Sequence, residues 1–335
     1  MGTRVADQNP RFELRNYITG SFYDKLSQDI LNGLTGSQKY IPSKYFYDDR
    51  GSRLYEQICK LPEYYLTRTE LSILREQSKA IMTPFDGGDL VELGSGTNWK
   101  ISTLIDAAKS QHGAHLRYVP VDISASALVV ASEDLLARYA KLKVLGIVAD
   151  FTRHLEILPC DSTRLLIFFG STIGNLTESE RLDFLRLVAH SLRPGDRFLI
   201  GLDMVKPREI VEAAYNDRQG VTSAFNKNVL QVINRELHAD FDPSVFRHLA
   251  FYNEANEQIE MHLQAIHQTT VEISDLDLSV VFEPGETIQT EICSKFSKES
   301  TLKMFSEAGL KVMRWFTDPQ GWFSLVELVR TSEFY

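Results

Sequence analysis

The pentapeptide Glu92-Leu93-Gly94-Ser95-Gly96 constrains the fold of this 335-residue chain more than any other segment. It follows the apolar run Asp89-Leu90-Val91, which has the character of a buried strand. Glycine lets a backbone turn sharply and approach a ligand where a side chain would block the way. A strand that ends in such a turn is typical of a nucleotide-binding corner, although many α/β proteins carry the same turn for packing alone.

Two further apolar runs end in acidic residues. Leu116 to Val121 is followed by Asp122, and Lys143 to Ala149 is followed by Asp150-Phe151. A carboxylate at the tip of an adjacent strand can accept both hydroxyls of a ribose, and an acid followed by an aromatic ring can bind and cover an adenine. The alternative is that each Asp only caps the helix after it. The ordered set of one corner and two acids looks like the site of an S-adenosylmethionine methyltransferase.

Trp99 argues against other nucleotide cofactors. The dinucleotide-binding fingerprint needs a small residue at this position, because the helix must pack closely on the strand. A tryptophan there disfavours nicotinamide and flavin cofactors.

Strands and helices alternate along the chain with the spacing of a doubly wound parallel sheet. The pattern predicts strands over Arg164–Gly170 and Arg197–Asp203, with a helix over Glu178–Leu192 between them. Near the C-terminus it predicts a helix over Lys298–Ala308 and a hairpin over Lys311–Phe316 and Trp322–Arg330. We expect an α/β fold with the Rossmann-like sheet of class I methyltransferases, which typically ends in such an antiparallel pair.

This alternation breaks between Lys206 and Phe296. Helical patterns are followed there by alternating stretches typical of an antiparallel sheet, over Ile210–Tyr215, Asn228–Leu237, Val245–Leu249, Ile259–Ala265 and Thr269–Ile273. The first 68 residues also lie outside the βαβ pattern. We therefore expect a methyltransferase domain over residues 69–204 and 295–335, and an inserted α+β substrate-binding subdomain over residues 1–68 and 205–294.

Composition argues against several classes of partner. The chain has 36 basic and 45 acidic residues, a net charge of −9, and no basic cluster, so nucleic acid is not an expected partner. It lacks the apolar segment of a secretory signal and any apolar run of about 18 residues. We expect a cytoplasmic monomer without membrane association. Cys59, Cys160 and Cys293 are far apart and the histidines lack a metal-binding spacing, so no metal site is expected.

Five blocks of sequence together resemble the histidine-specific Nα-methyltransferases of ergothioneine biosynthesis. They are Tyr45–Ser52 (YFYDDRGS), Leu61–Glu70 (LPEYYLTRTE), Gly170–Leu176 (GSTIGNL), Phe225–Asn228 (FNKN) and Ile233–Leu237 (INREL). Their order and spacing extend the resemblance over nearly the whole chain. It implies three methyl transfers from S-adenosylmethionine to the α-amine of L-histidine, giving hercynine.

The resemblance also implies which residues form the site. The family's cofactor positions fall on Gly94, Lys100, Asp122, Asp150 and Phe151. Its amino-acid positions fall on Tyr47, Tyr64, Asn175, Tyr215, Met261 and Glu291, of which Asn175 and Tyr47 are the candidate catalytic residues. Four of the five cofactor positions belong to the strand ends identified above.

The residue types at the amino-acid positions suit a histidine. Phenols such as Tyr47 and Tyr215 can donate to the α-carboxylate, and the Asn175 amide can accept from the amine while it donates to the carboxylate. Glu291 would accept a charge-assisted hydrogen bond from an imidazole N–H. Taken singly, a tyrosine-rich segment is more often packing, and an acid in an alternating strand usually faces solvent. The complete set of matching blocks is what favours a binding site.

One position departs from the family pattern. Cys293 stands where the family commonly has a serine, and a thiol is the weaker hydrogen-bonding group, so the second polar contact to the imidazole is weakened. Met261, which lines the side-chain pocket in the family, is present, and together with Glu291 it argues against a wide pocket for an indole. Two alternatives remain: methylation of another amino acid, such as tryptophan or a prenylated tryptophan, and a cofactor-binding sensor without turnover.

Overall fold

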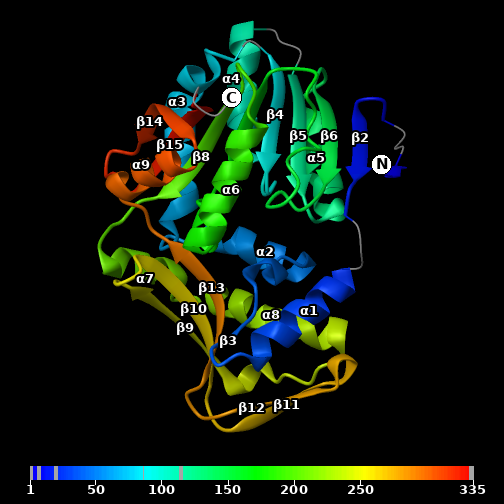
Figure 1. Cartoon of the computed structure of the whole chain (residues 1–335), viewed down its shortest axis with the longest axis vertical. Helices are drawn as coiled ribbons and strands as arrows, with labels where there is room; N and C mark the ends of the chain where they lie inside the picture. The colour runs from blue at the N-terminus through cyan, green and yellow to red at the C-terminus, as the bar shows by residue number, and fades with distance from the viewer. Residues whose placement is uncertain (1–2, 6–8, 19–21, 86, 113–115, 332–335) are drawn as a thin grey trace. The chain divides into compact units, whose positions relative to one another are not determined.

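Residues 1–19, 67–204 and 296–335 form one unit of the chain (unit 1), and residues 20–66 and 205–295 form the other (unit 2). The computed structural model describes residues 3–5, 9–18, 22–85, 87–112 and 116–331 (Figure 1). In that part of the chain, no helix is long and apolar enough to cross a membrane.

Unit 1 is built on a nine-stranded sheet of order β1-β2-β6-β5-β4-β7-β8-β15-β14. Its strands are β1 (Thr3–Val5), β2 (Phe12–Asn16), β4 (Gly88–Leu93), β5 (Leu116–Asp122), β6 (Lys143–Val148), β7 (Arg164–Phe168), β8 (Arg197–Asp203), β14 (Leu310–Thr317) and β15 (Phe323–Arg330). The six strands from β2 to β8 are parallel to one another, and β15 and β14 close the sheet as an antiparallel pair. A doubly wound parallel sheet that ends in an antiparallel pair is what the sequence predicts.

Helices cover both faces of this sheet, because its central strands are apolar on both sides. Leu90 of β4 packs in one core with helices α3 (Tyr65–Met82), α4 (Trp99–His112) and α5 (Ala125–Arg138). Val91, its neighbour in the strand, packs in a second core with α6 (Glu178–Ser191) and α9 (Lys298–Glu307). Helix α6 starts at a capping box in which Thr177 and Glu180 satisfy each other's backbone N–H groups.

The N-terminus differs from the expected division of the chain. We expected residues 1–68 to belong with the inserted segment, but β2 pairs in parallel with β6 and lies in unit 1. Phe12 and Leu14 of β2 are buried in the first core, and Gly146 of β6 leaves room for the Leu14 side chain. Strand β2 therefore joins the sheet by packing against β6, a strand some 130 residues away, although no βαβ pattern surrounds it in the sequence. Residues 1–2 and 332–335, at the ends of the expected ranges 1–68 and 295–335, lie outside the described residues.

Unit 2 contains a four-stranded sheet of order β3-β13-β10-β9 and a separate hairpin, β11-β12. The strands are β3 (Lys39–Tyr40), β9 (Phe246–Asn253), β10 (Gln258–Ala265), β11 (Thr269–Ile273), β12 (Leu278–Phe282) and β13 (Thr287–Ser294); the α-helices are α1 (Phe22–Thr35), α2 (Asp49–Ile58), α7 (Arg208–Tyr215) and α8 (Val221–Leu237). The α8 helix contributes Phe225, whose ring lies 4.7 Å from that of Phe46. The expected antiparallel strands are present, and Thr269–Ile273 pairs with β12 in the hairpin, apart from the four-stranded sheet.

A buried ion pair at the start of β7 provides a test of what stabilises unit 1. Arg164 donates from its backbone and its guanidinium to Asp196, at 2.7–2.9 Å, and both side chains are almost fully buried. Asp196→Ala leaves a buried guanidinium without its carboxylate, so we expect the free energy of unfolding to fall by about 3–5 kcal/mol in chemical denaturation. Asp183→Ala breaks the exposed Arg186–Asp183 pair and is the matched control; its change should stay within about 0.5 kcal/mol. Equal losses in the two variants would contradict this account.

Candidate functional site

The predicted cofactor residues gather at the carboxyl edge of three neighbouring strands in unit 1. The Gly94 N–H, just beyond β4, donates to the Val121 carbonyl of β5 at 2.9 Å, and the Ala149 N–H, just beyond β6, donates to the Asp122 carbonyl at 3.0 Å. These bonds extend the sheet past its last paired residues. They hold the turn after β4 beside the acids that end β5 and follow β6.

The backbone favours glycine at position 94, because its φ of +70° is a conformation that other residues rarely adopt. The Phe151 ring borders this turn, 3.4 Å from where a Cβ of residue 94 would lie. Phe151 is fixed in turn by edge-to-face contacts with Phe168 and Phe184. Gly96, by contrast, has no heavy atom within 4 Å of an added Cβ, so packing does not explain the second glycine of the motif.

Asp122 is not the cap of the helix that follows it. Ser124 is the N-cap of α5, and the Asp122 carboxylate accepts from the Ser124 backbone N–H at 2.9 Å. Burial raises the pKa of Asp122 to about 6. A half-buried carboxylate at the end of a strand suits a ligand that donates hydrogen bonds.

Asp150 precedes no helix either. One of its oxygens accepts from the Thr152 backbone N–H at 3.1 Å and from the Thr152 hydroxyl at 2.6 Å, so this acid fixes its own turn. The other oxygen lies 3.6 Å from the exposed Arg153 guanidinium. The cap alternative therefore does not hold for Asp150, although the acid has a clear local role.

Lys100 lies in the first turn of α4 and makes an ion pair that the sequence did not suggest. Its ammonium is 2.6 Å from the carboxylate of Glu70, which is completely buried, and 5.6 Å from the centre of the Phe169 ring. Glu70 falls on the apolar side of α3, with Leu66, Ile73 and Leu74 at helical spacing. An acid on the apolar side of a helix is the sequence pattern that indicates a buried charge at this position.

Glu92, the acid of the corner motif, is buried beneath the turn. The Tyr118 hydroxyl donates to it at 2.5 Å, and burial raises the pKa of Glu92 to about 7. This carboxylate is held by a neighbouring strand and supports the corner from inside the sheet.

Asn175 ends the short 3₁₀-helix η2 (Thr172–Asn175), which follows β7 in unit 1. The turn begins with Gly170 and Ser171, whose φ angles of +75° and +57° bend the chain sharply after the strand. The Ser171 hydroxyl accepts from the Asp203 backbone N–H of β8 at 2.9 Å. The candidate catalytic amide thus stands on a turn anchored to two strands.

The other six predicted amino-acid residues lie in unit 2, where aromatic rings form a connected cluster. Tyr55 bridges Tyr47 and Tyr64, with ring centres 5.6 and 6.4 Å away, and Tyr64 lies 6.3 Å from Tyr215. Burial raises the pKa of Tyr64 well above its ordinary value, and the neighbouring Tyr64 phenol does the same for Tyr55. Both phenols therefore remain protonated hydrogen-bond donors. Tyr55 was not among the predicted residues.

Lys295 is a second residue that the sequence did not suggest. It is 2% exposed, and its ammonium donates to the Tyr215 hydroxyl at 3.3 Å and to the Cys293 sulfur at 3.2 Å. The spacing of Glu291, Cys293 and Lys295 at every second residue was the pattern that could have identified it.

Met261 and Glu291 face each other across the β10–β13 ladder. Directly opposed residues of an antiparallel pair project to the same side of a sheet, and so does Cys293, two residues further along β13. Met261 is buried and Glu291 half-buried, so this acid is not on a fully solvated face. The structure therefore brings the three predicted side-chain-pocket residues to one face.

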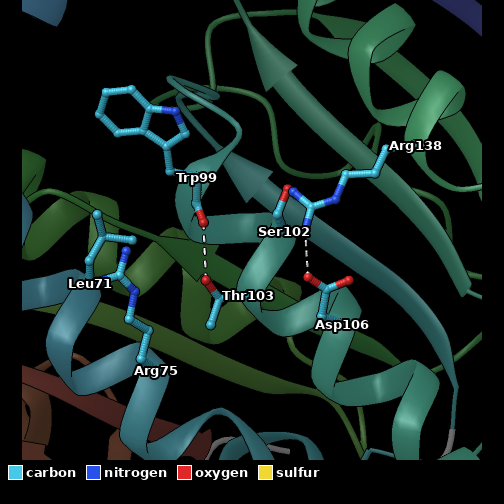
Figure 2. A pocket seen from close by; sticks show the side chains of 7 residues that line it. All are labelled: Leu71, Arg75, Trp99, Ser102, Thr103, Asp106 and Arg138. Atoms are coloured by element: carbon cyan, nitrogen blue, oxygen red, sulfur yellow. Dashed lines mark hydrogen bonds and ion pairs between the residues drawn. The ribbon is translucent and has the colours of Figure 1, made fainter.

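A pocket of about 380 Å³ in unit 1 is distinct from these residues. Figure 2 shows its lining side chains on α3, α4 and α5: Leu71, Arg75, Trp99, Ser102, Thr103, Asp106 and Arg138. Asp106 and Arg138 form an ion pair within it, and none of the five predicted cofactor residues lines it. Across the described ranges, no group of three His, Cys, Asp or Glu side chains is arranged to hold a metal ion.

Proteins of known activity are similar to this chain over most of its length. A family model described as histidine-specific methyltransferase, SAM-dependent, matches residues 26–330. The histidine N-alpha-methyltransferases of Mycolicibacterium smegmatis and Mycobacterium tuberculosis are each 44% identical to the chain, covering 95% and 90% of it and 99% and 93% of their own lengths. Ergothioneine biosynthesis protein 1 of Schizosaccharomyces pombe is 29% identical over 82% of the chain and 36% of that protein. The similarity spans both units.

The raised pKa of Asp122 predicts how cofactor affinity depends on pH. A carboxylate accepts from two ribose hydroxyls only when ionised, so affinity should be full well above pH 6 and fall as the acid gains a proton near and below pH 6. We expect the dissociation constant of S-adenosylhomocysteine, measured by calorimetry, to rise about tenfold from pH 7.5 to pH 5. Asp122→Asn should bind weakly with little pH dependence, and Glu92→Gln should keep the wild-type dependence below pH 6. An Asp122→Asn variant with the full tenfold change would refute the assignment.

Proposed function

The chain belongs to the S-adenosylmethionine-dependent, histidine-specific methyltransferase family, and on this premise we propose that it transfers three methyl groups to the α-amine of L-histidine, giving hercynine for ergothioneine biosynthesis. The observation that carries the proposal is the 44% identity with two histidine N-alpha-methyltransferases over nearly their full lengths. The enzyme is a methyltransferase and S-adenosylmethionine is its cofactor.

The residues of unit 1 fit this cofactor. Gly94 leaves the turn after β4 without a side chain, beside the Phe151 ring. In our proposal Asp122 accepts from the ribose hydroxyls, and Asp150 with Phe151 binds the adenine. The Lys100 ammonium suits the only carboxylate of the cofactor, which is in its methionine part. When bound, the cofactor supplies a methyl group on a positively charged sulfur.

The residues of unit 2 fit a histidine. Tyr47, Tyr64 and Tyr215 supply phenol donors for the α-carboxylate. Glu291 supplies the acceptor for an imidazole N–H, and Met261 on the same face of the sheet supplies apolar bulk beside it. Asn175 of unit 1 is assigned to the amine.

Methyl transfer requires that the α-amine is bound in its neutral form. The amine must be neutral so that its lone pair can form the new N–C bond, while the C–S bond breaks and its electron pair stays on sulfur. Each transfer therefore releases one proton from nitrogen. None of the residues assigned to the amine is a strong base, so we propose that the proton is lost to water. Positioning then supplies most of the acceleration, which can reach about 7–11 kcal/mol in well-oriented reactions.

A substrate screen tests the function directly. The purified protein is incubated with S-adenosylmethionine and each of the twenty amino acids in turn, and the products are identified by mass. We expect successive gains of one, two and three methyl groups on histidine alone. Methylation of tryptophan in place of histidine would show that the side-chain pocket binds an indole and not an imidazole. Cofactor binding without any methylated product would contradict the proposed activity.

Cys293 provides a second test, specific to this chain. A serine hydroxyl hydrogen-bonds more strongly than a thiol, and the net gain of one such bond is about 0.5–1.5 kcal/mol. Cys293→Ser should therefore lower the KM for histidine by about two- to tenfold, with the KM for S-adenosylmethionine unchanged. Cys160→Ser, at an exposed position of unit 1, is the control and should change neither constant. An unchanged KM for histidine in Cys293→Ser would show that residue 293 does not contact the substrate.

A further inference from the structure

Glu70 is a buried charged group of unit 1 that the proposed function does not use. It lies on α3 with no solvent exposure, whereas the cofactor residues assigned above lie at the end of β5, on turns and on α4. An ionised carboxylate is costly to bury unless it is paired and hydrogen-bonded. The contacts of Glu70 therefore indicate why an acid is kept at this position.

Glu70 contacts both sides of the candidate cofactor site. One of its oxygens is 2.6 Å from the Lys100 ammonium of α4. Its two oxygens also accept from the Gly170 backbone N–H, at 3.0 and 3.1 Å. Gly170 opens the turn that leads to Asn175. One buried carboxylate thus joins the cation assigned to the cofactor to the turn that carries the amide assigned to the amine.

One glycine leaves room for this arrangement, and the backbone conformation favours glycine at a second position. A Cβ on Gly201 of β8 would lie 2.5 Å from a Glu70 carboxylate oxygen, so no side chain is compatible with the present position of the acid. A Cβ on Gly170 would lie 3.5 Å from the Lys100 ammonium, and its φ of +75° favours glycine in any case. Groups from α3, α4, β8 and the turn after β7 therefore meet around the same carboxylate.

The ion pair with Glu70 restricts the movement of the Lys100 side chain. Lysine carries a compact charge on a flexible four-carbon stem, and fixing it in one direction costs conformational entropy. Glu92 also lies near enough to interact electrostatically with Lys100, but its hydrogen bond comes from Tyr118. Glu70 is the acid that the ammonium contacts.

We propose that Glu70 is a positioning residue for methyl transfer: it directs the Lys100 ammonium toward the carboxylate of the cofactor's methionine part and fixes Gly170 at the start of the Asn175 turn. This inference rests on the proposed cofactor role of Lys100. Glu70 itself touches neither cofactor nor substrate in this proposal.

Two ligands that differ only in the amino-acid part test the first half of the proposal. S-adenosylhomocysteine and 5′-methylthioadenosine share the adenosine and a neutral sulfur, but only the former has a carboxylate. Glu70→Gln keeps the size of the side chain and removes its charge. We expect its dissociation constant for S-adenosylhomocysteine to rise about tenfold, as befits a hydrogen bond to a charged group. That for methylthioadenosine should stay within about twofold. Equal weakening of both ligands, or of neither, overturns the proposal.

A double-variant cycle asks whether Glu70 acts through Lys100. Lys100→Met should weaken S-adenosylhomocysteine binding by tenfold or more, and adding Glu70→Gln to it should cause no further loss. Losses that multiply would show that Glu70 acts independently, against the proposal. Glu76→Gln, at an exposed position of the same helix, is the matched control and should leave both affinities unchanged. These binding measurements need no amino acid, so they remain decisive even if histidine is not the substrate.

Turnover rates test the second half of the proposal, that Glu70 fixes Gly170 at the start of the Asn175 turn. The Gln amide oxygen can still accept from the Gly170 N–H, whereas Glu70→Met, of similar volume, cannot. With the cofactor and the amino acid that accepts the methyl group both saturating, we expect kcat of Glu70→Met to fall about tenfold below that of Glu70→Gln, because the Gly170 N–H has lost its partner. Equal kcat values would show that the Gly170 contact does not position the turn.

Discussion

The candidate site in unit 1 depends on one constraint: parallel strands deliver their carboxyl ends to the same edge of a sheet. Here the constraint is enforced past the ends of the strands, where Gly94 and Ala149 donate to carbonyls of β5. Three residues that lie far apart in the sequence, Gly94, Asp122 and Asp150, are thereby held on adjacent strand ends. The positions of Phe151, which packs over Gly94, and of α4, which begins a few residues later, follow from that edge.

The same constraint explains what could be predicted from the sequence. A strand buried on both faces is a continuous apolar run, and such runs mark β5, β6, β7 and β8 to within two residues. The acids after β5 and β6 could be placed together without knowing any side-chain contact. Strand β2 could not be found this way, because its five residues alternate in burial and its partner, β6, lies far along the chain.

Buried charges are the part of the site that the sequence does not reveal. Glu70 and Lys295 belong to different units, yet both were missed for the same reason. The value of a buried ion depends on its partners, and those partners, Lys100 and Gly170 for the acid and Tyr215 for the lysine, come from other elements of the fold. Spacing can indicate that a charged residue falls on an apolar face. It cannot identify the group that the charge meets there.

The protonation states of unit 2 agree with the chemistry proposed for it. Methyl transfer needs an amine that has lost its proton, while a phenol must keep its proton to donate to a carboxylate. Burial moves the pKa of Tyr64 upward, away from the range in which an α-amine titrates. Tyr55, beside it, is shifted in the same direction. A rise in pH that frees the amine therefore leaves these donors intact, so that substrate activation and carboxylate binding do not compete for the same protons.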